Sequence, residues 1–106
     1  MDQTNGKVFL TGFELEPAEK AITDNIIKNY SHKISERSKY EYIKLRLKKS
    51  QHGKAYHHDV DGKLKVGNKV FSAKVTDYNL FSAVAEVLEK LLNEMTHKIR
   101  TNRQTK

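Results

Sequence analysis

The chain has 106 residues, of which 37% are hydrophobic and 31% charged, and it contains no cysteine. This length suffices for one domain around one hydrophobic core. The absence of cysteine excludes disulfide bonds and thiolate metal sites. No run approaches the ~18 apolar residues of a membrane-spanning helix. The first residues show neither the basic start nor the apolar run of a secretory signal, so we expect a cytoplasmic protein without a membrane partner.

The net charge is +7, and its distribution along the chain is uneven. Residues 40–76 contain nine basic and three acidic side chains, whereas the segments on either side are nearly balanced. Such an excess is typical of proteins that bind a polyanion such as nucleic acid or an anionic membrane surface. Lysines that only keep an exposed sheet face soluble would produce part of the same pattern.

The first 39 residues predict a short strand followed by a helix. Residues 7–11 are mostly apolar and partly β-branched, which indicates a strand. Pro17 is typical of the first turn of a helix. The apolar residues that follow recur at helical spacing, so we expect a helix to about Lys33 and a polar loop over residues 35–39. These apolar residues are Ile22, Ile26, Ile27, Tyr30 and Ile34.

From residue 40 the apolar period changes to two, which predicts three strands that each have one buried face. The first strand precedes a connection over residues 50–54, and the second covers residues 56–66. Gly67-Asn68 is typical of a two-residue hairpin turn before the third strand. The residues expected on the buried face are Ile43, Leu45, Leu47, Val60, Leu64, Val66, Phe71, Ala73 and Val75.

Asn79 is a suitable N-cap for a long second helix. Its apolar stripe consists of Phe81, Val84, Leu88, Leu91 and Met95. We expect a flexible N-terminus over residues 1–6, a single domain over 7–100 and a basic C-terminal tail over 101–106. The predicted order β-α-β-β-β-α gives an α+β fold. We expect a four-stranded mixed sheet with both helices packed on one face and the other face open to water.

Two groups of basic residues are candidates for binding. Alternation along the strands gathers one tyrosine and six cations on the open sheet face, as a layer of phosphate contacts would require. These residues are Tyr42, Lys44, Arg46, Lys48, Lys63, Lys65 and Lys74. A second group, at the end of the last helix, would equally complement the negative end of the helix dipole. It consists of His97, Lys98, Arg100 and Arg103.

Chemistry of other kinds has little support in the sequence. His57 and His58 would point to opposite faces of a strand, and no metal-ligand motif includes them or the nearby His52 and Asp59. We therefore expect no metal and no cofactor. The sequence has no nucleophile elbow, phosphate-binding loop or dinucleotide fingerprint, and no paired carboxylates suited to acid–base work. We expect that the protein is not an enzyme.

Several segments resemble the ribosome hibernation-promoting factors and ribosome-associated inhibitors, a family also labelled sigma-54 modulation proteins. The similar segments are Leu10-Thr11-Gly12 with Glu14-Leu15 and Ala18, residues 70–73, residues 79–84, and Leu88, Lys90, Leu91 and Met95. The chain departs from the family pattern at Asn79 and Ala85, where Asp is common, and at Asn93-Glu94, where Arg-Gln is common. Its length resembles the short form of the family.

The resemblance implies a fold related to double-stranded-RNA-binding domains and a ribosomal partner. The protein would bind rRNA in the small-subunit channel of messenger and transfer RNA and would block translation by occlusion. We expect it to act as a monomer. Of the basic positions on the family's last helix, Lys90 is the one that this chain retains. Two other hypotheses stay open: a generic RNA- or DNA-binding module, and a protein-interaction domain that binds an acidic partner.

Overall fold

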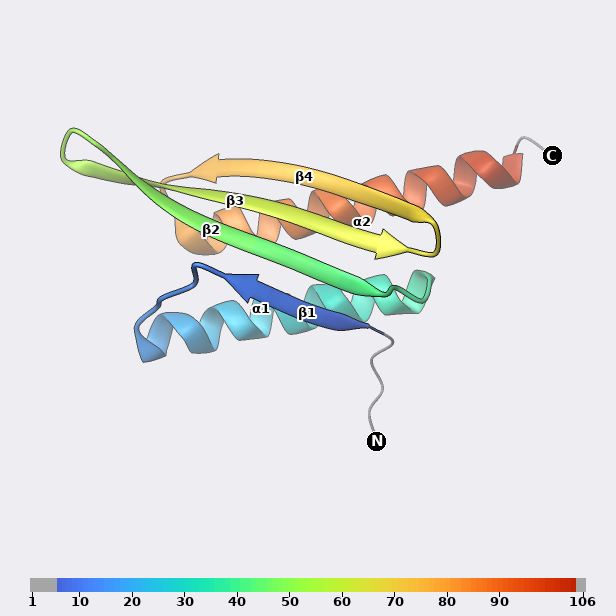
Figure 1. Cartoon of the computed structure of the whole chain (residues 1–106), viewed down its shortest axis with the longest axis horizontal. Helices are drawn as coiled ribbons and strands as arrows, with labels where there is room; N and C mark the ends of the chain where they lie inside the picture. The colour runs from blue at the N-terminus through green and yellow to red at the C-terminus, as the bar shows by residue number, and fades with distance from the viewer. Residues whose placement is uncertain (1–5, 105–106) are drawn as a thin grey trace.

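The computed structural model describes residues 6–104, with the side chains of His52 and of residues 99–104 left out. The elements follow the predicted order β-α-β-β-β-α and confirm the α+β fold. They are β1 (Lys7–Thr11), α1 (Pro17–Arg37), β2 (Tyr42–His52), β3 (Ala55–Val66), β4 (Lys69–Asp77) and α2 (Leu80–Gln104). Figure 1 shows the sheet as one layer and both helices as a second layer behind it.

The sheet is mixed, with strand order β1-β2-β3-β4. β1 runs parallel to β2, and the other two pairs are antiparallel hairpins. The hairpin turns contain Gly53 and Gly67 at φ 66° and 60°, a left-handed backbone conformation that glycine adopts without strain. In the strand order β1-β2-β3-β4, the two edges of the sheet are β1 and β4. None of the helices in the described part of the chain has the length and apolar character needed to cross a membrane.

The core lies between the sheet and the helices, and α2 supplies its largest share. The strand residues expected on the buried face lie there, with Val66 and Ala73 only half-buried. The stripe of α2 is buried except for Phe81, which is half-buried against the same core. Asn79 caps α2 as predicted, because its Oδ1 accepts the Ser82 N–H at 2.9 Å. The helix continues to Gln104, so residues 101–104, which we expected in a tail, belong to α2.

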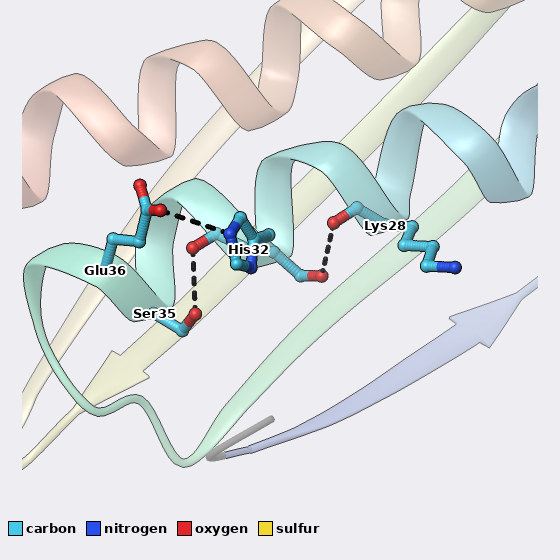
Figure 2. A network of polar contacts seen from close by, with 5 residues as sticks. Lys28, His32, Ser35 and Glu36 are labelled. Atoms are coloured by element: carbon cyan, nitrogen blue, oxygen red, sulfur yellow. Dashed lines mark hydrogen bonds and ion pairs between the residues drawn. The ribbon is translucent and has the colours of Figure 1, made fainter. Parts of the chain in front are cut away.

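Two expectations about α1 were wrong. The helix does not end near Lys33 but continues to Arg37, through most of the expected loop. Ile34 is fully buried and holds this last turn against the core. The polar side chains around it find partners inside the helix: Ser35 Oγ donates to the His32 carbonyl at 2.8 Å, and His32 lies 3.1 Å from Glu36 (Figure 2).

The second wrong expectation concerns the buried face of α1. Its buried residues are Thr23, Ile27, Ser31 and Ile34. Ile22 is 47% exposed, and Ile26 and Tyr30 are half-buried at the border of the core. The predicted stripe had combined two adjacent rows of the helix surface, and only the row that includes Ile27 and Ile34 faces inward.

Candidate nucleic-acid interface

The face of the sheet opposite the helices is here called the open face. Its residues are Lys7, Phe9 and Thr11 of β1; Tyr42, Lys44, Arg46 and Lys48 of β2; Asp59, Asp61, Lys63 and Lys65 of β3; and Val70, Ser72, Lys74 and Thr76 of β4. This assignment follows from alternation, because every second side chain of a strand points to the same face. Their partners on the other face, such as Ile43 and Leu64, are buried.

The register arranges the open face in rows that cross the strands. One row consists of Lys7, Tyr42, Lys65 and Val70, the next of Phe9, Lys44, Lys63 and Ser72, and the third of Thr11, Arg46, Asp61 and Lys74. The seven residues predicted for the open face therefore lie together on it. Most of them line a shallow groove of about 1060 Å³ over the middle of the sheet; Lys48 and Lys65 lie outside its lining.

The cations of the open face differ in how far acidic groups already neutralise them. Lys65 Nζ lies 3.5 Å from Glu41 Oε1, and Lys74 Nζ lies 4.0 Å from Asp61 Oδ1. Such exposed pairs contribute only about 0–1 kcal/mol each and leave the lysines able to exchange partners. Among the side chains that the structure describes, no carboxylate lies within ion-pair distance of the other five cations of this face. These are Lys7, Lys44, Arg46, Lys48 and Lys63.

Sequence reasoning missed two acidic residues of the open face, Asp59 and Asp61. Asp59 accepts hydrogen bonds from Thr76 Oγ1 at 2.6 Å and from Ser50 Oγ at 3.4 Å. The Thr76 bond is the main cause that lowers the pKa of Asp59, and the Ser50 bond adds to it. The signal for both aspartates was present in the sequence, because they share the parity of Lys63 and Lys65 along the same strand.

Sequence reasoning also missed Phe9, which is 47% exposed on the open face. The middle of β1, Val8-Phe9-Leu10, is apolar without alternation, so these three residues alone do not distinguish an inward from an outward face, although the polar Lys7 and Thr11 share the parity of Phe9. The register does, because it places Phe9 beside Lys44 and places Val8 and Leu10 beside the buried Ile43 and Leu45.

The second basic group lies on α2 and is separate from the open face. Lys90 and Lys98 are exposed. Lys90 borders a smaller hollow between α2 and the β4 edge, which it shares with Lys74, Glu94 and His97. Arg100 and Arg103 belong to α2, and their side chains lie outside the described set. Lys74 at the β4 edge lines both hollows, so the open face and the described part of the α2 group approach each other there.

The histidines near the β2–β3 hairpin lie on opposite faces of β3, as their adjacent positions require. The His57 ring packs edge-on against Tyr78, with 4.4 Å between ring centroids. His58 Nδ1 lies 3.3 Å from the Asp77 carbonyl oxygen. In the part of the chain that the structure describes, no three potential metal ligands of the His, Cys, Asp or Glu type come together.

No family model matches the sequence, and no curated protein matches it significantly. Solved structures do match the fold. One is a ribosomal subunit interface protein from Coxiella burnetii, with a TM-score of 0.61 at 15% identity over 89% of this chain and 98% of that one. Another is the N-terminal domain of Protein Y from Thermus thermophilus, with a TM-score of 0.55 at 12% identity over 83% of this chain and 90% of that one. The chain thus shares the fold of these proteins, and this agrees with the fold implied by the sequence resemblance.

Proposed function

We propose that the protein binds rRNA on the small ribosomal subunit and blocks translation by occupying the channel of messenger and transfer RNA. The observation that carries the proposal is the open face: a broad sheet surface with five cations that form no ion pair among the described residues, in a fold shared with a ribosomal subunit interface protein. The hibernation-factor resemblance of the sequence supports the same partner. Fold alone does not define function, and it is the charge of this surface that favours RNA as the ligand.

The proposed mechanism is electrostatic occlusion without chemistry. Lys44, Arg46, Lys48 and Lys63 project from adjacent strands, so several phosphates of one RNA segment can be contacted at once. Each contact releases condensed counterions, and log Kd should change with log salt by roughly 0.7 to 0.9 for each phosphate. The paired Lys65 and Lys74 would contribute less, since RNA must first displace Glu41 and Asp61 from them.

The test is sedimentation of purified ribosomes with the purified protein through sucrose gradients at low and high salt. We expect the protein in the small-subunit fraction at low salt and its release at high salt, with protein synthesis in a cell-free system inhibited in parallel. Binding to free RNA without ribosome association would favour a generic RNA-binding module. Salt-independent association with an acidic protein, and none with rRNA, would favour an interaction domain. Either result would contradict the proposal.

A further inference from the structure

We propose that the open face binds unpaired RNA bases, which stack on Phe9 and Tyr42, so that its ligand is a single-stranded rather than a duplex segment of RNA. This inference rests on the proposed function and specifies the kind of RNA that the same surface takes.

The two rings lie close together in the groove of the open face. Phe9 belongs to the row of Lys44 and Tyr42 to the adjacent row, so the rings are diagonal neighbours on the paired strands β1 and β2. Both line the groove. Phe9 is 47% exposed and lies among charged and polar side chains. Burial of its ring therefore contributes little to the stability of the fold. Exposed aromatic rings in a basic groove are the usual platform for single strands, because every base has a face that can stack.

The lysines around the rings fit the same ligand. Lys44 Nζ lies 4.6 Å from the centre of the Tyr42 ring, a cation–π contact in the free protein. A phosphate beside the groove would attract this ammonium group and uncover the ring. Lys63 follows Lys44 in the same row, so cations border the rings where the backbone of a stacked strand would run.

The presence of Asp61 in the groove indicates that the groove binds more than phosphates. Asp61 lies in the groove between Arg46 and Lys74, its side chain is partly exposed, and its Oδ1 lies 4.0 Å from Lys74 Nζ but accepts no hydrogen bond from the described residues. A carboxylate repels phosphate, but it accepts hydrogen bonds from the amino and imino groups of bases. Duplex RNA hides these groups in its base pairs, whereas an unpaired strand exposes them.

The chain contains no tryptophan, so Phe9→Trp introduces a unique fluorophore at the proposed platform. The probes are a single-stranded RNA oligonucleotide and an RNA duplex of the same length. Stacking should quench the indole fluorescence with the single strand and leave it unchanged with the duplex. Tyr56→Trp is the matched control, because Tyr56 is exposed on β3 outside the groove; its signal should not respond to either RNA.

Affinity provides the second measurement. Stacking of one base is worth about 1–3 kcal/mol, so Phe9→Ala should raise the Kd for the single strand about 5- to 150-fold, while Phe9→Trp should preserve it. Tighter binding of the duplex, or single-strand binding that neither quenches the fluorophore nor weakens in Phe9→Ala, would overturn the inference.

Ribosome binding separates this inference from the proposed function. If Phe9→Ala bound ribosomes with unchanged affinity while the triple variant Lys44→Glu, Arg46→Glu and Lys63→Glu did not bind them, stacking would be refuted and the proposed function retained. Failure of the unmodified protein to bind ribosomes would refute the proposed function itself.

Discussion

The two faces of the sheet come from the same strands and differ in almost every physical property. Toward the helices, β2 presents Ile43, Leu45 and Leu47, all buried, and the described core contains no ionised side chain. Toward solvent, the intervening positions of the same strand present Lys44, Arg46 and Lys48, all exposed. Because alternation separates the two sets, stability and binding should be separable by mutation. Substitutions on the covered face should destabilise the protein strongly, and those on the open face should change mainly what it binds.

The largest effect on stability is expected from Leu88→Ala. Leu88 is completely buried in the stripe of α2, so truncation loses apolar burial and leaves a cavity. We expect the free energy of unfolding to fall by about 2–5 kcal/mol, measured by denaturant titration. A loss of less than 1 kcal/mol would mean that α2 does not pack on the sheet as described.

Gly62→Val tests how closely α2 approaches the covered face. A Cβ at Gly62 would lie 3.0 Å from Leu91 Cδ1 and 3.2 Å from both Leu45 Cδ2 and Val87 Cγ2. The side chain would have to displace helix and strand neighbours, at a cost of about 1–3 kcal/mol. Ser72→Val is the matched control, since it adds a branched side chain to the adjacent strand on the exposed side. The free energy of unfolding of Ser72→Val should change by no more than about 0.5 kcal/mol. An equal loss in both variants would contradict the claimed difference between the covered face and the open face.

Tyr30→Phe examines the contact between the helices. The Tyr30 hydroxyl donates to Glu89 Oε1 at 2.8 Å, and this bond, with burial and the Glu89 charge, raises the pKa of Tyr30 above 10.0. Removal of the hydroxyl should cost about 1 kcal/mol at neutral pH. A raised pKa in the folded state means that the contribution is complete below pH 10 and is lost as pH rises through the folded-state value. The stability difference between the two proteins should therefore shrink in strong alkali; a constant difference would exclude the bond.

The smallest effect is expected from Thr76→Val on the open face. The Thr76 hydroxyl is the main cause of the lowered pKa of Asp59, so the variant should move that pKa back toward 3.8, as followed by NMR titration of the carboxyl carbon. A lowered pKa stabilises the fold above the unfolded-state value, and this contribution disappears as pH falls through the folded-state value. Wild type and variant should therefore converge in stability in acid. An unchanged pKa of Asp59 would show that Ser50 and the nearby cations hold the carboxylate instead.

Much of the fold could be predicted because the patterns are strong. Alternation predicted that Ile43, Leu45 and Leu47 are buried, and helical spacing predicted the same for Leu88 and its neighbours on α2. Each of these patterns is compatible with only one buried face. α1 was harder. Its isoleucines occupy two adjacent rows of the helix, and only tertiary packing decides that Ile27, rather than Ile22, is buried.

The candidate site was predictable only in part, for a related reason. Counting charges finds lysines, but the ion pairs of Lys65 with Glu41 and of Lys74 with Asp61 depend on strand register. Phe9 was missed because it stands between two apolar residues, and only the pairing of β1 with β2 places it with the polar Lys7 and Thr11 on the open face. The predicted RNA contacts, including Lys90, Lys98 and Arg100, stay predictions of binding, although the positions of their backbones are now defined.

The central claim is that the open face, rather than the exposed side of α2, makes the main rRNA contact. Ribosome sedimentation of two charge-reversal variants tests it most directly. One variant combines Lys44→Glu, Arg46→Glu and Lys63→Glu, all cations without an ion pair among the described residues. The other combines Lys90→Glu and Lys98→Glu on α2. Both should remain folded, because exposed substitutions change stability by only about 0.5 kcal/mol each. We predict that the open-face variant leaves the small-subunit fraction and that the α2 variant stays in it. The reverse result would contradict the assignment of the contact face.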